Sequence, residues 1–234
     1  MREGWTYKKL GEVCYYPKDR IALSEISANQ YVGVETLVKD RGGVSFGDNL
    51  PNVDSAIKFI KEDVLIGNIR PYLKKIWISD RSGGASGDII VIRVSSNNKD
   101  SIVPHYLFKV LSSNKFFEYD NAHTHGAKMP RGDRNSIAEY IIPIPPISEQ
   151  ERIVAELDLL SSIIEKKKEQ LKAYDQLAQS IFYDMFGDPV TNEKGWEVKK
   201  LGEVYILKSG DGLSGNQRDR FLIPHAIKII VSRF

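Results

Sequence analysis

A predicted strand ends and a predicted long helix begins within the stretch Ile141-Ile142-Pro143-Ile144-Pro145-Pro146-Ile147-Ser148-Glu149-Gln150-Glu151-Arg152-Ile153-Val154. Its three prolines cannot lie inside a helix, because proline lacks the backbone N–H group that a helix needs. Ser148 is expected to be the N-cap, because Glu151 completes the Ser-x-x-Glu capping box. At the other end, Gly187 and Pro189 are typical of residues just after a helix. The pattern therefore predicts one helix over residues 147–187.

The predicted helix carries apolar residues at alternating spacings of four and three positions. This spacing continues for more than four heptads, with Lys167 as its one polar member, and predicts a coiled-coil seam. About 38 residues rising about 1.5 Å each would form a rod about 57 Å long. The helix either folds back over its own domain or, as we expect, pairs antiparallel with the same helix of a second copy. The residues expected to form this dimer contact are Ile153, Leu157, Leu160, Ile164, Leu171, Tyr174 and Ile181.

A ten-residue stretch occurs twice in the chain. Gly4–Val13 and Gly195–Val204 share eight of ten residues, at an offset of 191 positions. Reuse of a local turn and strand start is one explanation. We favour a duplicated unit of about 190 residues, in which residues 188–234 are the start of a truncated second copy. Residues 221–234 match nothing expected of such a copy, and we attribute them to a truncation or a change of reading frame.

Residues 1–146 are predicted to form an α/β domain. Runs rich in β-branched residues predict four strands, which clusters of Gly, Asn and Asp separate. Apolar residues at helical spacing predict a helix over 104–117. The predicted strands cover residues 30–37, 75–78, 89–94 and 140–144.

The composition is typical of a cytoplasmic globular protein. Hydrophobic residues make up 41% of the 234 residues, and the formal net charge is +2. The chain has no apolar run of about 18 residues and no signal-like N-terminus, so we expect neither a membrane span nor export. Cys14 is the only cysteine, which excludes an internal disulfide and a multi-cysteine zinc site. The small net charge by itself argues neither for nor against a nucleic-acid partner.

Together these features resemble the specificity subunits of type I restriction–modification systems. The domain-to-helix junction at 141–154 and the repeated opening at 4–13 are typical of that family. Residues 62–75 (EDVLIGNIRPYLKK) and 87–93 (GDIIVIR) resemble its mid-domain segment. The resemblance extends from residue 4 to about residue 213.

The resemblance implies an α/β target recognition domain followed by a long coiled-coil α-helix. In that family, each recognition domain reads one half of a split double-stranded DNA sequence, and the helices set the gap between the halves. Modification (methyltransferase) subunits, which bind S-adenosylmethionine, join the specificity subunit, and restriction subunits are further partners. The implied function is sequence-specific DNA recognition, with neither catalysis nor a cofactor of its own. A coiled-coil scaffold that does not read DNA is the alternative.

Basic and amide residues in three loops are the candidates for DNA contact. The first loop, residues 123–135, lies before the last predicted strand. Its side chains suit phosphates and base edges, but a solvated basic loop has the same composition. Arg70, in the second loop, can instead pair with an acid in a structural turn. The candidates are Lys128, Arg131, Arg134, Asn135, His123 and His125 in the first loop, Arg70, Lys74 and Lys75 in the second, and Arg41 with Lys39 in the third.

No sequence pattern for catalysis or metal binding accompanies these loops. The chain lacks a Gly-rich cofactor loop and a methyltransferase motif, and Cys14 does not follow a proline. Glu62 and Asp63 precede an apolar strand without the carboxylate cluster that Mg²⁺ needs. A metal site at His123 and His125 is the less favoured interpretation, because no third ligand is evident nearby.

Overall fold

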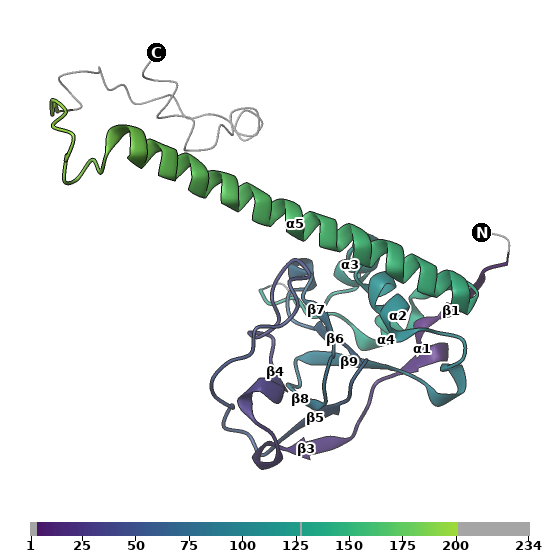
Figure 1. Ribbon diagram of the computed structural model, residues 1–234. Helices are drawn as coiled ribbons and strands as arrows, with labels where there is room; N and C mark the ends of the chain where they lie inside the picture. The colour runs from purple at the N-terminus through teal and green to yellow at the C-terminus, as the bar shows by residue number, and fades with distance from the viewer. Residues whose placement is uncertain (1–3, 127, 201–234) are drawn as a thin grey trace. The chain divides into compact units, whose positions relative to one another are not determined.

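The computed structural model describes residues 4–126 and 128–200 (Figure 1). The chain divides into two compact units, residues 1–169 and 170–234, and the boundary falls inside the longest helix. Residues 201–234, which include most of the expected second copy, lie outside the described residues. None of the described helices is both long and apolar enough to cross a membrane.

The described strands of the first unit form three small sheets (Figure 1). They are β1 (Thr6–Lys9), β2 (Cys14–Tyr15), β3 (Arg20–Ala22), β4 (Tyr31–Val32), β5 (Ser55–Phe59), β6 (Val64–Gly67), β7 (Ile76–Ile78), β8 (Gly83–Ala85), β9 (Ile89–Val94) and β10 (Ile141–Ile144). The central sheet has the order β2-β9-β6-β7 and is antiparallel. The second sheet has the order β3-β5-β8-β4, in which the β4–β8 pair is parallel. In the third sheet, β1 pairs antiparallel with β10, with Thr6 opposite Ile144.

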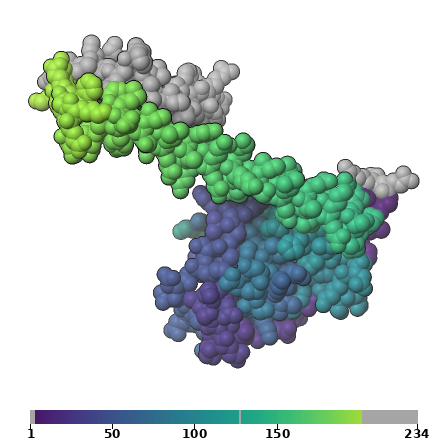
Figure 2. Space-filling view, viewed as in Figure 1, coloured from purple at the N-terminus to yellow at the C-terminus, as the bar shows by residue number. Residues whose placement is uncertain are grey.

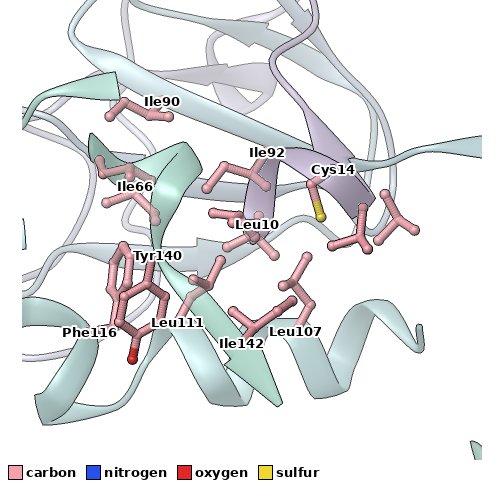
Figure 3. Close-up of a cluster of buried hydrophobic side chains, with 14 of the residues drawn as sticks. Leu10, Cys14, Ile66, Ile90, Ile92, Leu107, Leu111, Phe116, Tyr140 and Ile142 are labelled. Atoms are coloured by element: carbon pink, nitrogen blue, oxygen red, sulfur yellow. The ribbon is translucent and has the colours of Figure 1, made fainter. Parts of the chain in front are cut away.

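Residues of the central strands alternate between two cores, as strand geometry requires. The helices are α1 (Leu10–Val13), α2 (Pro104–Leu111), α3 (Asn114–Ala122), α4 (Arg134–Glu139) and α5 (Ile147–Phe186). On one face of the sheet, Ile66 lies in a cluster with Leu107 of α2 and Phe116 of α3 (Figure 3). On the other face, Leu65 belongs to a cluster with Phe59 of the second sheet. The central sheet is therefore buried between a helical layer and the second sheet.

The α/β domain and the long helix are as predicted, but the element boundaries differ. Strand β9 covers the predicted residues 89–94. The strand predicted at 30–37 is only the two-residue β4. It ends there because Gly33 and Thr36 form a turn, in which Thr36 N donates to Gly33 O at 3.2 Å. Strand β6 is the apolar strand expected after Glu62 and Asp63, whereas β1, β2, β3, β5 and β8 were not predicted.

The helix predicted at 104–117 is two helices, α2 and α3. Helix α2 ends at Leu111, and Ser113 is the N-cap of α3, because its Oγ accepts a hydrogen bond from Phe116 N at 3.2 Å. Phe116 and Phe117 are both fully buried, so the break turns a second apolar face onto the central sheet.

The long helix α5 covers 40 residues, and its start corrects one prediction. Ser148 is not the N-cap, because it lies inside the first turn. The carbonyl of Pro146 accepts hydrogen bonds from Glu149 N at 2.9 Å and Gln150 N at 3.0 Å, so the helix begins at Ile147. The predicted end is confirmed, since Gly187 follows the last helical residue with φ +76° and donates to Tyr183 O at 2.8 Å.

Gln150 fastens the first turns of α5 to the domain. Its side chain is fully buried, where Oε1 accepts from Val103 N at 2.9 Å and Nε2 donates to Ser101 O and Pro145 O, both at 2.8 Å. Trp5 Nε1 adds a hydrogen bond to Glu149 Oε2 at 3.0 Å. The beginning of α5 therefore packs closely on the domain of residues 4–146 (Figure 2).

Candidate nucleic-acid interface

The structure brings the three predicted loops together. The segment after β6 joins the 123–135 loop, because Arg70 N donates to Pro130 O at 2.8 Å and Gly132 N donates to Asn68 O at 3.1 Å. An antiparallel bridge between Ile69 and Arg131 lies between these two hydrogen bonds. Two segments that lie more than 50 residues apart in the sequence therefore form one surface.

The third loop joins the same surface from the other side of the Pro71–Leu73 turn. Asp40 N donates to Leu73 O at 2.9 Å, and Arg41 N donates to Lys74 O at 3.0 Å. The turn is thus held by backbone hydrogen bonds on both flanks, which gives the residues around it a defined position.

Within the first loop, the backbones of His125 and Arg131 are joined by two reciprocal hydrogen bonds. His125 N donates to Arg131 O and Arg131 N donates to His125 O, both at 2.9 Å. Lys128 and Met129 lie between these residues and are exposed. Lys128 is therefore an exposed cation close to two residues whose backbones are hydrogen-bonded to each other.

Arg134 and Asn135 lie in the first turn of α4 rather than in a loop. Asp133 is the N-cap, and its carboxylate accepts from Asn135 N at 3.3 Å and Ser136 N at 3.0 Å. The hydrogen bond from the Ser136 hydroxyl is the main cause of the lowered pKa of Asp133. Arg134 is exposed, with Nη2 donating to Gly87 O at 3.2 Å.

Arg131, a candidate for DNA contact, forms an ion pair with an acidic residue of the domain. Its guanidinium pairs with Asp88 at 2.8 Å, and the Arg131 side chain is still 53% exposed. Asp88 therefore orients the guanidinium without covering it. Arg70 is also exposed. We call Arg70, Lys128, Arg131, Arg134 and Asn135 the basic surface.

The other basic candidates have partners inside the domain. Arg41 donates to Ser112 O and Asn114 Oδ1, and Lys74 Nζ donates to the same Asn114 Oδ1 at 3.0 Å. Lys75 Nζ donates to Val34 O. These three side chains hold α3 and the 34–41 segment against the Pro71–Leu73 turn. That they also contact DNA stays a prediction.

Backbone strain is concentrated at this surface. Asp40, Arg41, Arg70 and Lys74 have φ values of 55°, 64°, 55° and 51°, in the left-handed region that non-glycine residues rarely adopt. Each such residue costs about 1–3 kcal/mol, and such residues cluster at binding sites. The hydrogen bonds across the two flanks of the turn maintain this conformation.

His123 and His125 lie at the edge of the surface. His123 Nδ1 is 2.7 Å from Tyr119 O, and its ring lies 4.3 Å from that of Tyr119. Within residues 4–126 and 128–200, no group of three or more His, Cys, Asp or Glu side chains is arranged to hold a metal ion.

Sequence reasoning missed the residues that organise the surface from below. Asp88 forms an ion pair with Arg131, and Asn114 Oδ1 accepts hydrogen bonds from the side chains of Arg41 and Lys74. The Oδ1 atoms of Asn68 and Asp120 lie beneath Gly132. Their only sequence signal was that Asn68 and Asp88 lie in the two mid-domain segments already singled out. Asn114 and Asp120 had no such signal, because a polar residue in an amphipathic helix is ordinarily solvated.

The chain matches one protein family over most of its length. The model of the type I restriction modification DNA specificity domain matches residues 2–173. The type I restriction enzyme MjaIX specificity subunit of Methanocaldococcus jannaschii is 31% identical over 127 residues, 48% of this chain and 29% of that protein. The EcoDI specificity subunit of Escherichia coli is 29% identical over 138 residues, 57% of this chain and 30% of that protein.

Solved structures agree with this match. The HsdS subunit from Thermoanaerobacter tengcongensis has a TM-score of 0.59 and 26% identity, over 84% of this chain and 52% of that one. A chain from a study of complex assembly and conformational transition in the type I R-M system has a TM-score of 0.62 and 25% identity, over 87% of this chain and 55% of that one. The matched part of this chain thus spans about half of each of these two solved chains and under a third of each of these two curated relatives.

Proposed function

Because this chain belongs to the family of type I restriction modification DNA specificity domains, we propose that it reads a DNA sequence and directs a partner methyltransferase to it. The observation that carries this proposal is the basic surface, where three loops meet and present exposed cations next to a strained, hydrogen-bonded turn. Lysine and arginine on such a surface supply phosphate contacts, and arginine and asparagine supply base contacts. The chain itself would bind DNA without catalysing a reaction.

The proposed complex contains modification subunits, and restriction subunits can join it. S-adenosylmethionine would be bound by the modification subunits, which would carry out methyl transfer. The complex would act in the cytoplasm, where the chromosome of a bacterial or archaeal cell lies.

Pairing through α5 is the proposed mode of assembly. Leu160 and Ile164 are each 55% exposed, Leu171 is 64% exposed and Tyr174 is 56% exposed. A coiled-coil seam of this kind is stable when an equivalent helix covers it. An antiparallel pair of copies would present the basic surface twice, and its target would be two inverted half-sites separated by a gap.

Selection from a randomised duplex DNA library tests the proposed function. The purified chain should enrich a defined motif, and its affinity should fall steeply with salt, because phosphate contacts release counterions. Lys128→Ala should weaken binding to all sequences and lower the salt slope by about one. Lys99→Ala is the matched control, since Lys99 is exposed beyond the opposite end of β9 from Asp88. If no motif is enriched and the salt slope is flat, the chain does not read DNA.

A further inference from the structure

Two buried side-chain oxygens converge beneath the basic surface. Asp120, on α3, is 1% exposed, and Asn68 follows β6. Neither Asp120 Oδ1 nor Asn68 Oδ1 has a hydrogen-bond partner among the residues that the structure describes. A Cβ atom on Gly132 would lie 2.5 Å from Asp120 Oδ1 and 3.1 Å from Asn68 Oδ1, so both oxygens face the same point.

A proton on Asp120 would satisfy both oxygens. A buried acceptor without a donor costs about 1–3 kcal/mol, and a buried carboxylate without a partner costs more. An ionised carboxyl group and an amide oxygen are both acceptors only, whereas a protonated carboxyl group has one O–H donor. A neutral Asp120 can therefore donate to Asn68 Oδ1 and satisfy both groups.

The electrostatic surroundings favour a neutral acid below about pH 6. Burial raises the pKa of Asp120 from its ordinary value of 3.8 to about 6, although nearby His123 lowers it. Tyr16 also lies close by. Its pKa is raised chiefly by burial, and Arg134, Asp120 and Asp133 contribute smaller electrostatic effects. Arg131, on the same loop, pairs with Asp88 instead.

We propose that Asp120 is a positioning residue for DNA recognition, which as a neutral acid donates a hydrogen bond to Asn68 and so holds the basic surface together. Asn68 O already accepts from Gly132 N at 3.1 Å, so Asn68 links α3 to the loop that carries Arg131. Arg70 lies two residues after Asn68. Ionisation of Asp120 would replace the hydrogen bond by repulsion between two acceptors and loosen both segments. This inference rests on the proposed DNA-reading function.

The first test measures the affinity for the selected DNA duplex between pH 5 and pH 8. The Kd of the wild-type chain should rise about tenfold over this range, because the neutral form that holds the basic surface is lost as the pH passes the Asp120 pKa of about 6. Asp120→Asn should bind as tightly as wild type at pH 5 and keep that affinity at pH 8, because its amide donates to Asn68 at every pH. Both proteins keep His123 and His125, so the difference between their profiles reports Asp120 together with its electrostatic coupling to His123. Glu118→Gln is the control, since Glu118 is exposed on the same helix.

The second test measures folding without DNA. Since the folded-state pKa of Asp120 is raised, its contribution to stability is complete below about pH 4 and is lost as the pH rises to about 6. Asp120→Asn should therefore melt at a higher temperature than wild type at pH 8, and this difference should disappear near pH 4.

The outcomes distinguish a failure of the proposed role of Asp120 from a failure of the proposed DNA-reading function. If Asp120→Asn keeps the wild-type pH profile for DNA affinity, Asp120 does not position the basic surface, whatever the folding test shows. In that case the proposed function stands. If the wild-type chain binds no duplex at any pH, the proposed function fails and the role in recognition fails with it. If the two proteins have the same melting profile, Asp120 is not a neutral acid.

Discussion

The double substitution Leu157→Asp and Ile164→Asp tests the proposed helix pairing. Leu157 is 39% exposed and Ile164 is 55% exposed, so about half of each side chain remains for a partner helix to bury. Full burial of such a side chain is worth about 1.5–3 kcal/mol, so the remaining half is worth about 1 kcal/mol. Two positions in each of two copies therefore lose about 4 kcal/mol, which corresponds to about a thousandfold increase in the dimer Kd.

Light scattering at micromolar concentration should show a dimer for the wild-type chain and a monomer for the double variant. Circular dichroism should show an unchanged helix content. Leu159→Asp is the matched control, because Leu159 is 61% exposed but lies outside the four-and-three spacing. A monomeric wild-type chain, or equal dissociation by Leu159→Asp, would refute the seam as the dimer contact.

Three other substitutions have defined outcomes. Gln150→Ala removes a fully buried side chain and its three hydrogen bonds, so urea unfolding should show a loss of about 2–4 kcal/mol. A loss below 1 kcal/mol would mean that Gln150 does not fasten α5. Gly132→Ala places a Cβ 2.5 Å from Asp120 Oδ1, so DNA affinity should fall at least tenfold. Gly47→Ala is the control for the added methyl group, because a Cβ on the exposed Gly47 would meet no atom within 4 Å. Equal affinities of Gly132→Ala and wild type would contradict the close packing beneath the basic surface. Arg131→Ala should cost about 1–3 kcal/mol and relax specificity at one base pair of the selected motif. An unchanged motif with unchanged affinity would remove Arg131 from the interface.

Local patterns in the sequence predicted the long helix well. The heptad spacing and Gly187 correspond to α5 and its end, but the predicted N-cap, Ser148, lies inside the helix, which begins at Ile147. That error arises because Pro146 O accepts the first helical hydrogen bonds, which no side-chain pattern reports. In the second sheet, strand β8 was not predicted, because Gly83 and Gly84 have low strand propensity. A Cβ on Gly83 would lie 2.0 Å from Gln30 O, so close packing requires glycine there.

The candidate site was predicted as three separate loops of suitable composition. The sequence could not distinguish basic side chains that face solvent from those that bind within the domain. Arg70 and Lys128 are exposed, whereas Arg41 and Lys74 donate to Asn114. The difference depends on the position of α3, which lies in another part of the chain.

Local sequence patterns were sufficient to predict the α/β domain, the helix with its apolar seam and the residue types available for DNA contact. These properties depend on periodicity and on residues within a few positions of each other. In contrast, the packing of sheets and helices brings the loops into one surface and places the Oδ1 atoms of Asp120 and Asn68 near the same point beneath it. The hydrogen bond from Arg41 to Asn114 joins residues 73 positions apart, and such contacts depend on how sheets and helices pack rather than on any local pattern.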